Sequence, residues 1–140
     1  MRYLIDTNIF VYVAMDRDSL SRDVLAILDE WDTQLYMSVE SIRELILLYR
    51  NKRLGSKLWK SAEELVRSIE KDYFIKILPL REEHLITYSC LRVNEADGHK
   101  DPSDHVIIAH AMTEHLPLIS SDRRFEYYRQ QGLDLIFNRK

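Results

Sequence analysis

The chain has 140 residues, of which 46% are hydrophobic and 31% charged, a balance typical of one globular domain spanning 1–140. Only 3 Gly and 3 Pro argue against a disordered or collagen-like chain. The net charge of -3 excludes a protein that binds nucleic acid through bulk positive charge.

The first predicted element is a short buried strand over residues 1–5. It ends at Asp6, because Thr7 and Asn8 make local side-chain hydrogen bonds that compete with strand pairing. Asn8 is the expected cap of a helix over the apolar run 9–13. The carboxylate of Asp6 is thereby placed at the carboxyl end of a strand, where open α/β sheets bind ligands. Taken alone, an acid at this position more often caps a turn.

Helical and strand patterns then alternate along the first half of the chain. Apolar residues at spacings of three and four predict a helix over 19–31, with Trp31 on its buried stripe. A strand over 34–37 follows, and Ser38 opens a helix through Tyr49 in which Val39 faces inward.

Gly55 is expected to break that helix, and a further helix over 56–71 buries Leu58 and Trp59. The second half then continues the alternation. Its predicted elements are a strand over 74–78, a helix over 81–94 with Leu85 and Cys90 inward, a helix from Asp101-Pro102 to His115, a strand over 116–120, a helix over 122–131 stopped by Gly132, and a strand over 133–137.

Strands separated by helices predict parallel pairing with helices on both faces of the sheet. The expected fold class is therefore α/β, with a central, mostly parallel sheet of four to five strands flanked by helices. The single Cys90 cannot form an intramolecular disulfide, which favours a reducing, cytoplasmic setting. No apolar run approaches the roughly 20 residues of a membrane span, and the N-terminus lacks the apolar core of a signal peptide.

Four acids occupy comparable places on this frame. Asp6 and Asp122 each follow a strand, so both should lie at the carboxyl edge of the sheet. Glu44 lies one turn into a helix beside its apolar stripe, and Asp104 lies one turn into another. Because all four follow a strand end or a helix start, they are expected to converge on one cleft.

Four neighbouring carboxylates repel one another strongly unless they take up protons or bind a divalent cation. With hydroxyl and amide oxygens from Thr7, Asn8 and Ser120 nearby, the donor set suits Mg²⁺ or Mn²⁺. Zinc is disfavoured, because His105 and His110 are not spaced as zinc ligands. A divalent cation held by carboxylates is suited to phosphodiester hydrolysis.

Four segments in this order resemble a PIN domain: "LIDTNIF", "SVESIRELI", "DPSDHVIIAHA" and "PLISSDRRF". The resemblance runs from Tyr3 to Phe125, and within the family the small VapC-type toxins of bacterial toxin–antitoxin pairs are most similar. It implies a PIN-like three-layer sandwich and an Mg²⁺- or Mn²⁺-dependent ribonuclease acting on RNA. It further implies a homodimer that a cognate antitoxin protein inhibits, with no membrane contact.

Carried over by position, the family's catalytic and metal-binding acids fall on Asp6, Glu44, Asp104 and Asp122. Its supporting polar positions fall on Asn8 and Ser120, and Thr7 is placed to orient the first acid by a hydrogen bond. No acid of the set is substituted, which implies an active enzyme.

Several other residues have competing interpretations. Asp101 is either a fifth ligand or the N-cap of its helix, and the Pro that follows it favours the cap. Glu40 is interpreted as a structural acid at a helix start, His110 as a core residue and His105 as a surface residue.

RNA contact is assigned first to Arg123 and Arg124, which adjoin Asp122. A second basic cluster around Gly55 includes Lys52 and Arg53, with Tyr49 and Trp59 near enough in sequence to stack bases. Its remaining cations are Arg50, Lys57 and Lys60. The cluster is at least as well explained as a solvated turn, or as a dimer or antitoxin surface.

Three other functions compete with a toxin. A housekeeping RNA-processing nuclease would use the same acids. A haloacid-dehalogenase-like phosphatase would want a second acid at the position of Asn8. A receiver-like or scaffold domain would bind Mg²⁺ or a partner without cutting, and would want a late Lys that the chain does not offer cleanly.

Overall fold

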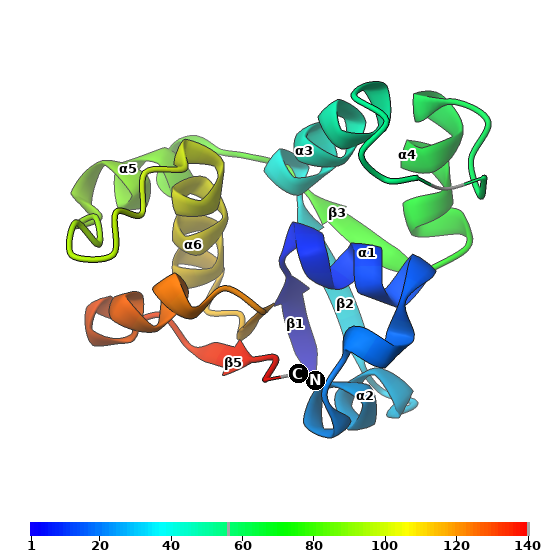
Figure 1. The fold of residues 1–140 in the computed structure, drawn as a ribbon. Coiled ribbons are helices and arrows are strands. Elements are labelled where there is room, and N and C mark those ends of the chain that lie inside the picture. Colours follow the sequence, from blue (N-terminus) through cyan, green and yellow to red (C-terminus); the bar gives the residue numbers. More distant parts are fainter. Residues whose placement is uncertain (56, 140) are drawn as a thin grey trace.

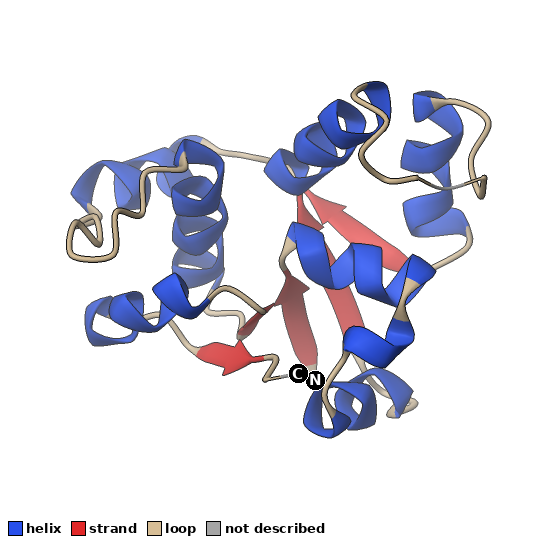
Figure 2. Cartoon of the chain, in the orientation of Figure 1, coloured by secondary structure: helices blue, strands red, loops and turns tan. Residues whose placement is uncertain are grey.

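The computed structural model describes residues 1–55 and 57–139, and its centre is a sheet of five parallel strands. The spatial order is β3-β2-β1-β4-β5, as Figures 1 and 2 show. The strands are β1 (Arg2–Ile5), β2 (Gln34–Ser38), β3 (Ile75–Leu78), β4 (Leu118–Ser120) and β5 (Leu135–Phe137). Every pairing is parallel, so the predicted α/β sheet is confirmed.

Helices cover both faces of this sheet (Figure 2). The α-helices are α1 (Thr7–Met15), α2 (Arg22–Asp29), α3 (Val39–Arg50), α4 (Ala62–Lys71), α5 (Glu82–Cys90) and α6 (Pro102–Glu114). Two 3₁₀ helices, η1 (Arg17–Ser19) and η2 (Arg123–Gln131), complete the set in the described ranges. In that part of the chain no helix is long and apolar enough to cross a membrane.

Strand β1 divides the core into two layers because its side chains alternate between the faces of the sheet. Ile5 packs with Ile9 and Phe10 of α1, in a core that α2, α3 and α4 complete. Leu4 packs on the opposite face with Ile108 of α6 and Phe125 of η2. The predicted three-layer arrangement, helices on either side of one sheet, is therefore confirmed.

The first helix begins two residues earlier than predicted. Its N-cap is Asp6 and not Asn8, because the Asp6 carboxylate accepts a hydrogen bond from the Thr7 N–H at 2.8 Å. Asn8 lies inside α1 with its side chain exposed. An acid at an N-cap satisfies a free N–H and complements the helix dipole.

Helix α2 is shorter than predicted, whereas α3 agrees with its predicted range to within one residue at each end. Helix α2 ends at Asp29, before the side chain of Trp31, which is 95% exposed and not buried. Helix α3 ends at Arg50, before Gly55, and the exposed Val39 lies at its first position. Apolar spacing identified both helices, but it did not identify the residue where the backbone hydrogen bonds of α2 stop.

Helix α4 begins at Ala62, with Ser61 as its N-cap; the predicted start at Ser56 lies outside the described residues. Leu58 is half exposed and not buried as predicted, whereas Trp59 is buried. The indole N–H of Trp59 donates to the Ser68 hydroxyl at 3.0 Å, which satisfies its one polar atom inside the core.

The second half shows similar changes at element ends. Strand β3 starts after Phe74, whose φ of 56° does not fit a strand. Helix α5 stops at Cys90, and both Leu85 and Cys90 are exposed and not inward. The predicted helix over 122–131 is a 3₁₀ helix, η2, ended by Gly132 at φ 110°.

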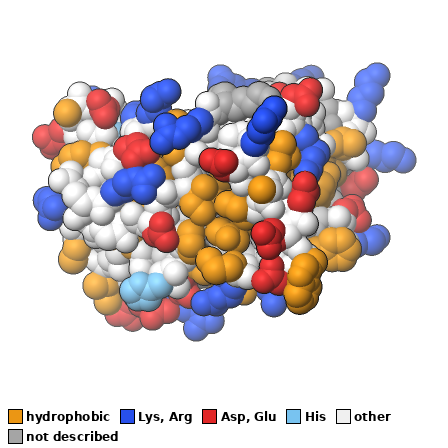
Figure 3. Space-filling model, turned by 90° about the horizontal axis from the view of Figure 1, so that it is seen from below, with side chains coloured by type: hydrophobic (Ala, Val, Ile, Leu, Met, Phe, Trp, Pro, Cys, Tyr) orange, Lys and Arg blue, Asp and Glu red, His pale blue; other side chains and the backbone are white. Residues whose placement is uncertain are grey.

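The lower face in Figure 1 mixes positive and negative side chains around a central group of hydrophobic ones, as the view in Figure 3 shows. Side chains of both signs on this face agree with the small net charge of -3 for the whole chain.

Candidate active site

The strand order reverses direction beside β1, and the candidate site lies at this point. From β1 the chain builds β2 and β3 on one side, while β4 and β5 lie on the other. Such a switch point opens a crevice at the carboxyl ends of the two central strands. Asp6 directly follows β1, and Asp122 follows β4 after one intervening residue. The Asp6 N–H donates to Ile119 of β4 at 2.9 Å, which joins the two strand ends.

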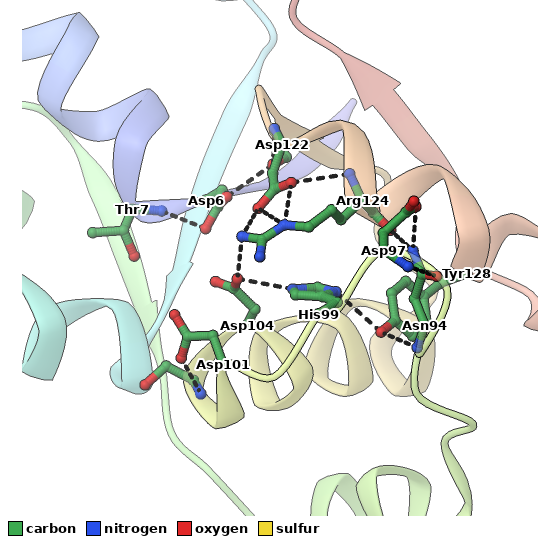
Figure 4. Close-up of polar contacts among 12 residues, drawn as sticks. Asp6, Thr7, Asn94, Asp97, His99, Asp101, Asp104, Asp122, Arg124 and Tyr128 are labelled. Atoms are coloured by element: carbon green, nitrogen blue, oxygen red, sulfur yellow. Dashed lines mark hydrogen bonds and ion pairs between the residues drawn. The ribbon is translucent and has the colours of Figure 1, made fainter.

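A cleft of about 390 Å³ lies at this point, and it brings together all four predicted acids. Asp6, Asp104 and Asp122 point toward one another in Figure 4, and Glu44 lines the same cleft from α3. The other polar and charged residues along its walls are Thr7, Asn8, Asn51, Arg53, Asp101, Ser103 and Arg124.

Asp6 is the most buried of the four acids, with 4% of its surface exposed. One oxygen accepts from the Thr7 N–H, and the other accepts from the Ser120 hydroxyl at 2.8 Å. The same Ser120 oxygen accepts the Asp122 N–H at 3.1 Å. Ser120 therefore lies behind the cleft and links two of its acids.

Glu44 reaches the cleft from the second turn of α3. The hydroxyl of Thr7 donates to its carboxylate at 2.6 Å. Thr7 was expected to orient the first acid; its backbone contacts Asp6 and its side chain contacts Glu44. This residue thus couples the start of α1 to α3.

Helix α6 supplies Asp104 and begins with Asp101. The Asp101 carboxylate accepts from the Ser103 N–H at 2.9 Å, so Asp101 is the helix N-cap, as predicted. It also belongs to the cleft, since one carboxylate oxygen each from Glu44, Asp101 and Asp104 lies within 4.8 Å of the others.

Arg124 is the basic residue that enters the acid cluster. Its guanidinium spans both oxygens of Asp122, at 2.7 Å from Oδ2 and 3.0 Å from Oδ1, and lies 3.8 Å from Asp104. Figure 4 shows this side chain reaching back across the cleft. Arg124 therefore offsets part of the negative charge of the two acids.

His99 is a functional candidate that sequence reasoning missed. It lies in the polar loop before α6, is completely buried, and its Nε2 is 2.9 Å from Asp104 Oδ2. A loop has no periodicity to mark a buried residue. The one available signal was a histidine two residues before the helix cap Asp101.

The three most enclosed acids all have raised pKa values. Burial, reinforced by the charge of Asp104, raises the pKa of Asp6 to about 7. Burial and neighbouring carboxylates also raise the pKa of Glu44 and of Asp104 to about 7. Burial would raise the pKa of Asp122 as well, but hydrogen bonds from Arg124 hold it below its ordinary value. The cleft therefore favours protons or added positive charge near neutral pH.

These donors suit a hard divalent cation. Glu44, Asp101 and Asp104 present oxygen atoms close enough together to share one ion. Burial and neighbouring carboxylates raise the pKa values of Glu44 and Asp104, so a cation would stabilise their ionised forms. Mg²⁺ and Mn²⁺ prefer such oxygen ligands. In a second group Asp104 and Asp122 lie with His99, whose ring nitrogen already contacts Asp104.

The remaining predicted residues are divided between the cleft and other places. Arg53 lines the cleft, and Lys52 lines an adjacent groove with Tyr49, Arg50 and Lys57. Arg123 is not among the cleft residues; its guanidinium lies 5.4 Å from the Phe137 ring centre. Trp59 is buried and so cannot stack on a base as suggested.

Two histidines and one acid complete the comparison with the sequence predictions. His105 was interpreted as a surface residue and is 6% exposed, because α6 turns it inward against the His99 ring. His110 is a core residue as predicted, 2.9 Å from the Ser38 hydroxyl. Glu40 is structural, accepting from Arg43 and Ser103.

Comparison with solved structures gives several full-length matches. VapBC2 from Rickettsia felis bound to a promoter DNA fragment contains a chain with TM-score 0.69 and 21% identity, covering 99% of both chains. VapBC-1 from nontypeable Haemophilus influenzae matches with TM-score 0.63 and 24% identity over 98% of each chain. DNA-bound VapBC from Salmonella typhimurium matches with TM-score 0.65 and 17% identity over 98% of each. At these identities the likeness concerns the fold.

A comparison with curated protein sequences gives no match. The family comparison is decisive, because the PIN domain model matches residues 3–130. That range contains β2, β3 and β4, all of β1 except Arg2, and every acid of the cleft. With this match and a five-stranded parallel sheet whose acids meet at the switch point, the chain belongs to the PIN domain family.

Proposed function

We propose that the protein is a metal-dependent endoribonuclease that hydrolyses RNA phosphodiester bonds, and that it is the toxin of a toxin–antitoxin pair. PIN family membership supports a nuclease. The observation that carries the chemistry is the convergence of Asp6, Glu44, Asp104 and Asp122 on one cleft.

In this proposal the four acids hold Mg²⁺ or Mn²⁺, with Asn8, Thr7 and Ser120 as supporting polar groups. The bound ion would supply water activation and charge neutralisation at the phosphate. Thr7 and Ser120 fix the orientation of Glu44 and Asp6 by direct hydrogen bonds. Asn8 lines the cleft with an exposed amide.

RNA would approach along the basic side of the cleft. Arg53 borders the acids, and Lys52 with Arg50 and Lys57 continues the positive charge into the neighbouring groove. Arg124 is placed to contact a phosphate where it now contacts Asp122. Arg123 is the weaker candidate, since it lies beside Phe137.

Substitution of the acids tests the proposal. Asp6→Asn and Asp104→Asn should each lower cleavage of RNA by about 100-fold or more, the range for losing one contact to a transition state. Both variants should unfold at no lower temperature near neutral pH, because each removes a charge from a repulsive cluster. Asp23→Asn, at an exposed acid of α2, is the matched control. Normal cleavage by either variant, or full wild-type activity in EDTA, contradicts the mechanism.

The antitoxin, the homodimer and the cytoplasmic setting are further parts of the proposal. VapBC structures are described as toxin–antitoxin systems, and this chain shares their fold over its full length. Expressed alone, the protein should arrest growth, and the small open reading frame beside its gene should relieve the arrest. Active cleavage without arrest would favour a housekeeping nuclease. Sedimentation velocity of the purified chain measures the dimer directly.

A further inference from the structure

The loop between α5 and α6 carries a buried histidine that faces the cleft from behind. Both ring nitrogens of His99 have partners: Nε2 lies 2.9 Å from Asp104 Oδ2, and Nδ1 lies 3.0 Å from the Tyr128 hydroxyl. Figure 4 shows the three side chains in line, running from the acid cluster to η2. None of the predicted roles of the four acids uses this chain of contacts.

The hydrogen-bond donors define the direction of this series of contacts from Tyr128 through His99 to Asp104. The Tyr128 oxygen accepts the Asn94 N–H at 3.1 Å, which leaves the hydroxyl hydrogen for Nδ1 of His99. Nδ1 is then the acceptor, so Nε2 carries the ring hydrogen and donates it to Asp104. This tautomer suits an ionised Asp104 carboxylate, which can only accept, and the Asn94 N–H on the Tyr128 oxygen agrees with it.

The loop is itself fixed in place by Asn94, which is 1% exposed. Its amide donates to the Asp97 carboxylate at 2.8 Å and to the Arg124 carbonyl at 3.2 Å. The His99 N–H donates to the Asn94 carbonyl at 3.0 Å. Phe125 stacks on the imidazole with ring centres 5.4 Å apart. The ring therefore has little freedom to turn away from Asp104.

We infer that His99 is a positioning residue for Asp104. By holding Oδ2, it leaves Oδ1, which accepts no hydrogen bond from the described residues, as the oxygen free for a cation. Histidine–carboxylate contacts behind a metal site orient the ligand, and losing one typically lowers metal affinity or activity about 10- to 100-fold. The inference rests on the proposed metal-dependent function.

Two matched pairs of variants test this inference. For each variant, Mn²⁺ binding is measured by electron paramagnetic resonance in the absence of RNA. His99→Leu removes the donor, whereas His99→Gln supplies an amide N–H at a similar reach. Tyr128→Phe removes the hydroxyl that fixes the tautomer, and Tyr127→Phe makes the same change at a neighbour whose hydroxyl bonds to none of the described residues. RNA cleavage then separates kcat from KM for each variant.

We expect His99→Leu to weaken Mn²⁺ binding about 10- to 100-fold and to lower kcat more than it changes KM. His99→Gln should recover most of both. Tyr128→Phe should weaken Mn²⁺ binding, and Tyr127→Phe should match the wild type. If His99→Leu does not fold, the two tyrosine variants decide.

Wild-type Mn²⁺ affinity in His99→Leu, or equal affinity in the two tyrosine variants, overturns the inference and leaves the proposed function standing. A wild-type protein that binds no Mn²⁺ overturns the proposed function itself, and the inference with it.

Discussion

Ser120 shows how one hydroxyl serves two acids of the cleft. It donates to Asp6 and accepts from the backbone of Asp122, so it stabilises the ionised form of one acid and the position of the other. Ser120 was predicted to end a strand, and it is the last residue of β4. What one sequence could not give is the partner, because Asp6 lies 114 residues away along the chain.

The prediction at this scale concerns Ser120→Ala. Loss of the donor should raise the pKa of Asp6 further above its ordinary value. The rise of cleavage with pH should then shift upward by roughly 0.7 of a unit, since a hydrogen bond contributes about 1 kcal/mol and one pKa unit corresponds to about 1.4 kcal/mol. A pH–rate profile measures the shift. Ser89→Ala, at an exposed serine of α5, should leave the profile unchanged.

Among the elements, α6 was predicted most accurately, and the reason is chemical. Asp101 followed by Pro102 fixes a helix start through a cap and a preset φ, so the sequence marks that boundary directly. No comparable signal marks the end of α2, and Trp31 was assigned to a stripe that the helix never reaches. The buried His99 escaped prediction because its burial comes from Phe125 and Tyr128, in a distant segment.

Substitutions of Asp101 can separate its role as the N-cap of α6 from its role in cation binding. Asp101→Ala should lower the free energy of unfolding by about 0.5 to 2 kcal/mol, whereas Asp101→Asn keeps the cap and should not lower it. Both variants should weaken Mn²⁺ binding, because both remove one charge from the group with Glu44 and Asp104. Chemical denaturation and a Mn²⁺ titration measure the two effects. Unchanged Mn²⁺ affinity in Asp101→Asn would restrict Asp101 to capping.

In the molecule as a whole, the enclosed acids Asp6, Glu44 and Asp104 lie together at the switch point of the sheet. Asp6, Glu44 and Asp104 have pKa values of about 7 in the folded protein, well above those of exposed acids. Between about pH 4 and pH 7 these three acids therefore bind more protons in the folded state than in the unfolded chain. Burial lowers the pKa values of His99, His105 and His110 from 6.5, so below about pH 6.5 these histidines act in the opposite sense. Protonation of these acids stabilises the fold, and this contribution is lost as pH rises through about 7.

Above about pH 6.5 the histidines are largely neutral in both states, so thermal unfolding from there to about pH 8 should show a midpoint that falls as pH rises in the absence of divalent ions. Added Mn²⁺ should raise the midpoint more at the higher pH, where the acids are ionised and free to bind it. Asp104→Asn should reduce both effects. A midpoint that rises steadily over this range would contradict the assigned pKa directions.

Because the pKa values of Asp6, Glu44 and Asp104 are raised, the cleft can also release protons. A cation entering at neutral pH displaces hydrogen ions from Asp6, Glu44 and Asp104, so occupancy depends on acidity as well as on cation concentration. Mild acidification would thus release metal from the cleft and, through protonation of these acids, stabilise the fold. Under the proposed function, the fold of the metal-free form would then be stabilised by protons in place of the cation.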